Sequence, residues 1–157
     1  MDNLTPAQRS RTMSLIRSKD TRPELTIRRL LHARGLRFRK HVRSLPGQPD
    51  LVFVSAGVIV FIDGDYWHGW RFPQWQHKLA PYWKQKIEGN RRRDLRNFRC
   101  LRRQGWVVIR LWEHQVKFDS GQCIARIEAV VRRRIAKSGF RPMPKLQRDS
   151  RPSDRIA

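Results

Sequence analysis

The sequence is short of cysteines, acidic residues and long apolar segments, and each shortage excludes a class of protein. Its two cysteines, Cys100 and Cys123, are too few for the disulfide framework of a small secreted domain, so we expect a reducing, cytoplasmic setting. No apolar run approaches membrane-spanning length, and the N-terminus shows neither a signal-peptide pattern nor a lipidation signal. We therefore expect no membrane partner.

Acidic residues are greatly outnumbered by basic ones. The 157 residues include 35 Lys and Arg but only 13 Asp and Glu, which gives a formal net charge of +22. A charge this large opposes the compact state and favours binding to a polyanion. Nucleic acid is the leading candidate, because neutralising its phosphates releases condensed counterions. An anionic membrane surface is the rival, but it would require an amphipathic basic helix or a lipid anchor.

The apolar pattern predicts a single α/β domain over residues 1–137, with a mixed β-sheet flanked by helices. Helices are predicted over residues 6–17, 21–35, 84–104 and 124–135, and strands over residues 51–54, 58–62 and 106–111. Residues 66–83 are predicted to form a large aromatic loop. Residues 138–157, rich in Pro, Arg, Ser and Asp, are predicted to be a basic, disordered tail.

The few carboxylates are the most informative residues in so basic a chain. Between residues 25 and 87 only Asp50, Asp63 and Asp65 are acidic, and all three lie at the ends of the predicted hairpin strands. A two-residue turn at residues 56–57 would place Asp50 opposite Asp63, with Cβ atoms about 4.5–5.5 Å apart. Carboxylates this close repel each other unless they share a proton or a cation. Magnesium accepts one or two carboxylates and keeps waters for a phosphate substrate.

Each of these aspartates also has a structural interpretation, since Asp is common in turns without any function. The facing pair in a strongly basic protein favours the metal site. His68, five residues after Asp63, could act as a general base because the histidine pKa lies near neutrality. Glu24 is the partner residue of a capping box that begins at Thr21, which by itself predicts a structural role.

Aromatic and basic residues are interleaved directly after the acidic cluster. For Tyr66 and Trp67, insertion into a DNA duplex is the favoured interpretation. Trp70, Phe72 and Trp75 are instead expected to cover the core. The following helix carries nine Lys or Arg, including Lys86 and Arg93, and we expect phosphate contacts from it. Asn90 on this helix could read a base edge.

Several short motifs follow one another along the chain: Arg11-Thr12-Met13, Thr21-x-x-Glu24, Pro46-Gly47-Gln48-Pro49-Asp50, Phe61-Ile62-Asp63-Gly64-Asp65-Tyr66-Trp67-His68-Gly69, Tyr82-Trp83-Lys84-Gln85-Lys86-Ile87 with Asn90 and Arg93-Asp94, Gly105-Trp106, and Leu111-Trp112-Glu113. Together they resemble the very-short-patch-repair (Vsr) DNA mismatch endonucleases, over roughly residues 9–116. The resemblance implies a restriction-endonuclease-like fold. It also implies magnesium-dependent hydrolysis of one DNA strand beside a T·G mismatch, which arises when 5-methylcytosine deaminates.

The resemblance also implies roles for single residues. Asp50 would be the central magnesium ligand, His68 the general base, and Glu24 would orient water or the histidine. This role for Glu24 comes from the resemblance alone. Residues matching those that insert into the duplex are Met13, Tyr66, Trp67 and Trp83, and those matching residues near the mismatched bases are Lys86 and Asn90. A bacterial, nucleoid-associated monomer that meets mismatch-repair proteins is the implied context.

Two departures from the family pattern bear on these roles. Well-known members have a histidine where this chain has Asp63, so we expect Asp63 to be a direct metal ligand. The family often carries a structural zinc held by cysteines near the positions of Asp65, Trp70 and His114. Those cysteines are absent here, so we expect no zinc, and the aromatic loop must be held by packing.

Two alternatives remain at this stage. One is a restriction-type or structure-specific DNA nuclease that ignores mismatches. The other is a non-catalytic basic protein that binds nucleic acid, which explains the charge equally well. The second alternative gives no reason for Asp50, Asp63 and His68 to converge.

Overall fold

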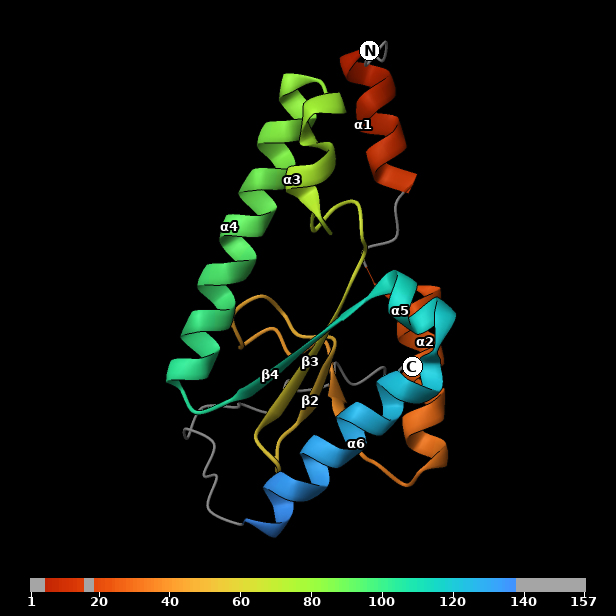
Figure 1. Cartoon of the computed structure of the whole chain (residues 1–157), viewed down its shortest axis with the longest axis vertical. Coiled ribbons are helices and arrows are strands. Elements are labelled where there is room, and N and C mark those ends of the chain that lie inside the picture. The colour runs from red at the N-terminus through yellow and green to blue at the C-terminus, as the bar shows by residue number, and fades with distance from the viewer. Residues whose placement is uncertain (1–4, 16–18, 138–157) are drawn as a thin grey trace, which may run out of the picture.

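A four-stranded sheet lies between two layers of helices in the computed structural model, which describes residues 5–15 and 19–137 (Figure 1). The strands are β1 (Arg39–Lys40), β2 (Leu51–Phe53), β3 (Val58–Asp63) and β4 (Val107–Trp112), in the spatial order β1-β2-β3-β4. The helices are α1 (Pro6–Leu15), α2 (Arg22–Ala33), α3 (Phe72–Trp75), the 3-10 helix η1 (Gln76–Lys78), α4 (Pro81–Arg103), α5 (Glu113–Phe118) and α6 (Ser120–Ala136). Because β3 pairs antiparallel with β2 and parallel with β4, the sheet is mixed, and the predicted α/β class is confirmed.

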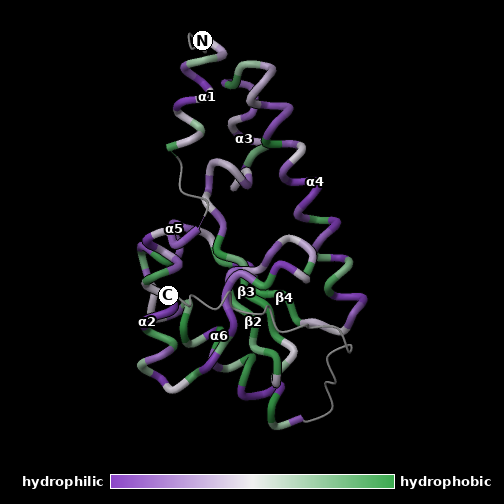
Figure 2. The backbone as a smooth tube through the Cα atoms, turned by 180° about the vertical axis from the view of Figure 1, so that it is seen from behind, coloured by the Kyte–Doolittle hydropathy of each residue, from purple (hydrophilic) through white to green (hydrophobic). Residues whose placement is uncertain are grey.

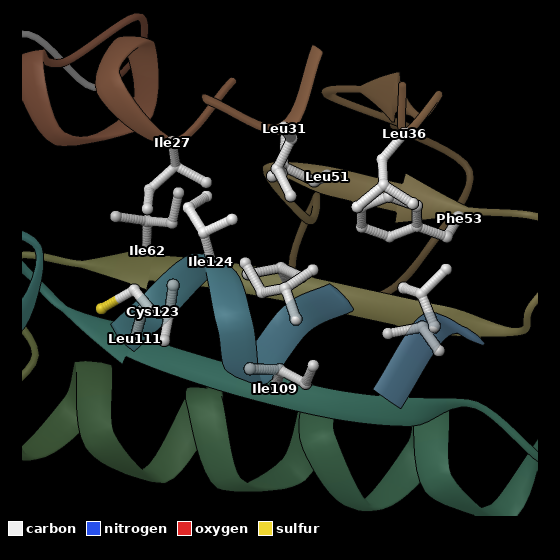
Figure 3. Packing of buried hydrophobic residues seen from close by; sticks show 14 of the residues in the cluster. Ile27, Leu31, Leu36, Leu51, Phe53, Ile62, Ile109, Leu111, Cys123 and Ile124 are labelled. Atoms are coloured by element: carbon white, nitrogen blue, oxygen red, sulfur yellow. The ribbon is translucent and has the colours of Figure 1, made fainter. Parts of the chain in front are cut away.

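One face of the sheet packs against α2, α5 and α6. Alternate residues of the central strands point to this face, as the two-residue period of a strand requires. Figure 3 shows Ile27 and Leu31 of α2 and Ile124 of α6 meeting strand residues such as Leu51 and Leu111. These five side chains are at most 1% exposed.

The opposite face packs against α4. Ile59 and Phe61 of β3 contact the cluster formed by Phe98 and Leu101 of α4, together with Trp106. Since both faces are covered, every residue of β3 is buried. Figure 2 shows the same distribution, with hydrophobic strands inside and largely hydrophilic helices outside.

The predicted register of the β2–β3 hairpin was wrong by two residues. Leu51 pairs with Val60 and Phe53 with Val58, so the connection is the four residues 54–57 rather than two. Ala56 in this connection is fully buried in the core and its carbonyl accepts a hydrogen bond from Arg134 Nε. A shift of two residues preserves the face of each side chain but moves Asp50 from opposite Asp63 to beside Phe61.

Several element boundaries also differ from the prediction. The long helix begins at Pro81 rather than residue 84, because extended Ala80 leads into a proline in the first turn. The segment 66–83 is not wholly a loop, since it contains α3 and η1. The short α5 was not predicted, and the backbone N–H of Trp112 at its start is capped by Gln115. The predicted disordered tail lies outside the described residues.

Helix α1 buries none of its residues and lies beside the N-terminal end of α4 in both views (Figures 1 and 2). Its Arg9 guanidinium stacks 4.4 Å from the ring centroid of Tyr82 at that end. Among the helices of the described residues, none has the length and apolar character needed to cross a membrane.

Two glycines allow a test of the packing between α4 and the aromatic segment. Gly69 has a φ of +69°, and a Cβ there would lie 2.7 Å from Arg91 Cδ and 3.1 Å from Ile87 Cγ2. We expect Gly69→Ala to destabilise the fold by more than the roughly 1–2 kcal/mol of left-handed strain, because the added methyl also meets Arg91 and Ile87. Gly89→Ala, in open space on α4, should stabilise it by up to about 1 kcal/mol. Urea unfolding measures the free energy of unfolding of both variants. Equal changes in the two would contradict the close packing of Gly69 against α4.

Candidate active site

Acidic residues from both faces of the sheet gather at one end of it. Because β2 runs antiparallel to β3, and β4 runs parallel to it, the start of β2 lies beside the ends of β3 and β4. A cleft of about 990 Å³ opens at this end. Its lining includes nine of the residues singled out in the sequence: Met13, Glu24, Asp50, Asp63, Trp67, His68, Lys86, Asn90 and Arg93.

Asp50 is the cleft carboxylate whose negative charge is least compensated by hydrogen bonds and ion pairs from its neighbours. Its Oδ2 accepts a hydrogen bond of 2.7 Å from the backbone N–H of Ile62. Burial, followed by the negative charges of Glu24 and Asp63, raises the pKa of Asp50 from 3.8 to about 7, against the opposing effects of the Ile62 hydrogen bond and Arg28. A carboxylate in this environment is stabilised by a proton or by a metal ion.

Asp63 is held from behind by Arg110 of β4. Arg110 Nε donates to Asp63 Oδ2 at 2.7 Å, and the other oxygen of Asp63 lies 3.5 Å from His68 Nε2. Burial raises the pKa of Asp63, and the charges of His68 and Arg110 offset only part of this effect. One oxygen of Asp63 is therefore committed to an arginine, and the other faces the predicted base.

His68 is oriented by Asp94 of α4. Its Nδ1 lies 2.7 Å from Asp94 Oδ2, which also accepts a hydrogen bond of 2.9 Å from Arg110 Nη2. A carboxylate can only accept here, so the proton is on Nδ1 and the lone pair of neutral His68 is on Nε2. Burial alone lowers the pKa of His68, but the Asp94 hydrogen bond and the charges of Asp63 and Asp94 outweigh it and raise the pKa.

Glu24 is 2% exposed and held by three donors. They are Thr21 Oγ1 at 2.9 Å, the backbone N–H of Asp20 at 3.0 Å and Arg28 Nη2 at 2.8 Å. The carboxylate does reach back over the start of α2, but the backbone donor it meets is one residue before the predicted cap. Glu24 thus has both a structural function and a place on the cleft.

Two groups of metal-capable side chains occur in the described part of the chain: Asp63 with His68 and Asp94, and Glu24 with Asp20 and His41. Both already hold an arginine, Arg110 in the first and Arg28 in the second. Asp50 belongs to neither group. Its only side-chain hydrogen bond within the described residues is the one it accepts from Ile62, so its second oxygen is available to a hard cation such as Mg2+, although no three-ligand group in this part of the chain includes it.

Tyr66 and Trp83 pack against Trp67, the one ring of these three that lines the cleft. Trp67 packs edge-to-face on Tyr66, with centroids 4.9 Å apart, and tilted on Trp83, at 5.6 Å. The Lys86 ammonium lies 5.8 Å from the ring of Trp67 and 5.6 Å from that of Trp83. Asn90 Nδ2 donates to the carbonyl of Trp67 at 3.0 Å, so the residue predicted to read a base also fixes the aromatic segment.

The aromatic segment is anchored to α5 through a histidine for which no function was predicted. His114 Nδ1 lies 2.7 Å from Asp65 Oδ1, and Trp70 packs on the His114 ring at a centroid distance of 4.8 Å. Trp70 also packs on Trp112 at 5.0 Å, and its backbone N–H donates to the Asp65 carbonyl. Ring packing, this Asp–His hydrogen bond and the hydrogen bond from Asn90 to Trp67 therefore hold this segment, while Cys123 is buried in the main core.

Comparison with known proteins identifies the family. The family model described as DNA mismatch endonuclease Vsr matches residues 1–74. The Type II nicking enzyme V.XorIIP of Xanthomonas oryzae pv. oryzae is 42% identical over 132 residues, covering 83% of this chain and 96% of that protein. This chain belongs to the Vsr family. It is also 37% identical to the Type II nicking enzyme V.NmeDIP of Neisseria meningitidis serogroup C, over 92% of this chain and all of that protein.

The DNA mismatch endonuclease Vsr of Escherichia coli K12 is 35% identical over 112 residues, 68% of this chain and 70% of that protein. The chain is accordingly a DNA endonuclease, and its mixed sheet with flanking helices is the restriction-endonuclease-like Vsr fold. This membership favours the nuclease interpretations over the non-catalytic alternative.

Sequence reasoning assigned no role to three residues of the Vsr cleft and its support. Asp94, quoted within a motif without a role of its own, lies on the buried side of α4 with Ile87, Phe98 and Leu101. An acid at an apolar position of an amphipathic helix was the available signal. Arg110 interrupts the apolar strand β4 in the same way. Glu113 is the first residue after that strand and lines the cleft.

The His68–Asp94 hydrogen bond predicts how activity depends on pH. A general base must be unprotonated, so the rate of DNA cleavage should rise with pH through the raised pKa of His68. Asp94→Asn removes the charge that raises this pKa, so the acidic limb should move to lower pH. The plateau rate should fall by part of the roughly 10²–10⁴-fold that a general base contributes. Single-turnover rates across pH measure both effects.

Glu88→Gln is the matched control, because it removes one carboxylate from an exposed ion pair with Arg92 on the same helix. It should leave the profile unchanged. An unshifted acidic limb in Asp94→Asn would show that His68 does not set the profile.

Proposed function

We propose that this Vsr-family enzyme nicks one strand of duplex DNA beside a T·G mismatch by metal-assisted hydrolysis. The observation that carries the proposal is the shared cleft of Asp50, His68 and Trp67, which joins an acid site to an aromatic cluster. Two further observations agree with it. Relatives that cover most of the chain carry the name nicking enzyme, and one is named a mismatch endonuclease.

Asp50 is the proposed ligand of a magnesium ion, with Asp63 offering the oxygen not bound to Arg110. A divalent cation held there would supply positive charge to the scissile phosphate and its leaving oxygen. Burial of Asp50 next to Glu24 and Asp63 makes the carboxylate costly without a cation, which supports this position. Arg110 limits the charge of the group, since it already neutralises part of Asp63 and Asp94.

His68 is the proposed general base, acting at Nε2. Asp94 fixes the ring through Nδ1, so the Nε2 lone pair is directed away from α4's carboxylate and can take a proton from water. Asp63, 3.5 Å from Nε2, then faces the protonated ring and stabilises its charge. Glu24, rigidly held on the same cleft, is proposed to orient the attacking water.

Met13, Tyr66, Trp67 and Trp83 are the proposed inserting residues. Unstacking a base step costs a few kcal/mol and is cheapest at a mispaired step. A rigid aromatic cluster beside the acid site would therefore favour a mismatch over paired DNA. Lys86 and Asn90 project from α4 onto Trp67 of the cluster, where they would meet the mismatched bases, and Arg93 is proposed to contact a phosphate.

A strand-resolved cleavage assay tests the function. End-labelled duplexes carrying T·G or the matched C·G, in several sequence contexts, are incubated with Mg2+ or with EDTA. We expect a single nick on the thymine strand of T·G duplexes, in Mg2+ only. Equal cutting of both duplexes would favour a nuclease without mismatch specificity. Cutting in EDTA would remove the metal from the proposal.

The raised pKa of Asp50, the proposed metal ligand, leads to a separate prediction about stability. Because the folded-state pKa of Asp50 is about 7 and its ordinary value is 3.8, the folded protein binds the proton more tightly. Metal-free stability should therefore fall as pH rises from about 4 to 7 and stay low above that range. Asp50→Asn should abolish nicking, spare DNA binding and raise the metal-free Tm by a few degrees at about pH 8.

Thermal unfolding with and without Mg2+ measures this linkage. Mg2+ should raise the Tm of the native protein more at about pH 8 than at about pH 6, and should not affect Asp50→Asn. A metal-dependent rise that persists in Asp50→Asn would place the ion elsewhere.

A further inference from the structure

Three arginines on the outer side of α4 have no acidic partner. Arg96, Arg99 and Arg103 are exposed, and no hydrogen bond or ion pair of their guanidinium groups occurs within residues 5–15 and 19–137. Together with Cys100 and Gln104 they line a surface hollow of about 430 Å³. This hollow is separate from the cleft, whose lining contains none of the five.

Several other arginines on the helical surface are engaged. Arg92 pairs with Glu88 at 3.7 Å, Arg132 with Glu128 at 2.7 Å, and Arg134 donates to the Ala56 carbonyl at 3.1 Å. Like charges three or four residues apart destabilise a helix. Three neighbouring arginines without a counter-charge are therefore a cost to the isolated protein that an anionic partner would remove.

The spacing of the three arginines matches a nucleic-acid backbone. Arg96 and Arg103 are seven residues apart, which is about 10 Å along the helix axis. Phosphates of one DNA strand rise about 3.4 Å each along the duplex axis, so α4 lying parallel to that axis would place the row beside about three of them. The hollow between the arginines gives room for a phosphate to lie among the guanidinium groups.

The row lies close to the cleft but outside it. Arg93 lines the cleft, and Arg96 is about 60° further round the same helix. Along the axis, the row begins about 9 Å beyond Asn90 and ends about 20 Å beyond it. Since α4 is one continuous helix of 23 residues, the row is held in a fixed position relative to the cleft.

We propose that Arg96, Arg99 and Arg103 form a second DNA-backbone contact, which binds the duplex that flanks the segment in the cleft. The proposal rests on DNA being the substrate of the cleft, but it does not depend on mismatch specificity. The hollow is lined by arginines, one glutamine and one cysteine, whereas the core of a protein–protein interface is apolar and poor in charge. DNA is therefore the better partner than a protein.

Contacts to phosphates carry no sequence information, so this surface adds affinity and orientation without specificity. It would hold the enzyme on long DNA while the cleft samples base steps. A duplex confined to the cleft would not reach it.

The test compares DNA binding as a function of duplex length. Anisotropy in EDTA, where cutting is prevented, gives the Kd for hairpin duplexes from about 8 to about 30 base pairs. The native protein should bind the longer duplexes more tightly. The variant Arg96→Gln/Arg99→Gln/Arg103→Gln should lose this gain, roughly tenfold on the longest duplex, and its salt slope should fall by about 2–3.

The control variant is Arg29→Gln/Arg133→Gln/Lys137→Gln, which removes the same charge from exposed positions on α2, α6 and the residue after it, across the sheet from α4. It should keep the length dependence. Equal losses in both variants, or no loss in the α4 variant, would overturn the proposal, as would capture of an acidic peptide with unchanged DNA binding. Because this assay measures binding without cleavage, its outcome does not depend on whether the enzyme nicks T·G duplexes.

Discussion

The ion pairs of Arg110 with Asp63 and Asp94 are the interaction on which the site depends. They join β3, β4 and α4 at the end of the sheet, and they place two buried carboxylates around one guanidinium. Buried charges are tolerated only when paired and hydrogen-bonded, and removing one partner leaves the others uncompensated. His68 completes the arrangement, since its Nδ1 binds the oxygen of Asp94 that Arg110 also contacts. The predicted base is thus oriented by a network that also fixes three elements of the fold.

Asp50 stands in contrast to this network. Its neighbours are Glu24 and Asp63, and its main support is a single backbone N–H. Asp63, Asp94 and Glu24 each accept a hydrogen bond from an arginine, whereas no side chain among the described residues donates to Asp50. Asp63 therefore both organises the site through Arg110 and offers its other oxygen to the proposed metal ion, whereas Asp50 has only the proposed metal-binding role.

The aromatic segment is also positioned by a small number of specific contacts. Asp65 and His114 fix its beginning, Asn90 holds the carbonyl of Trp67, and Trp70 packs between His114 and Trp112. Ring packing and these hydrogen bonds hold Tyr66 and Trp67 near the acids. The proposed insertion into a mismatch benefits from these contacts, because a cluster without them would lose conformational entropy when it became ordered on binding DNA.

The sequence by itself determined the helices and strands of the core and the acids worth attention. Periodicity placed α2, β3 and most of α4, because their burial follows the repeat of each element, and the scarcity of acids pointed to Asp50 and Asp63. Only the tertiary structure decided the pairings. The predicted hairpin register was wrong because Ala56 is buried in the core, which lengthens the connection between β2 and β3 to four residues. Asp94 and Arg110 were identified as partners of His68 and Asp63 only through long-range contacts. Periodicity is a local property, whereas the compensation of buried charge depends on elements that are distant in sequence.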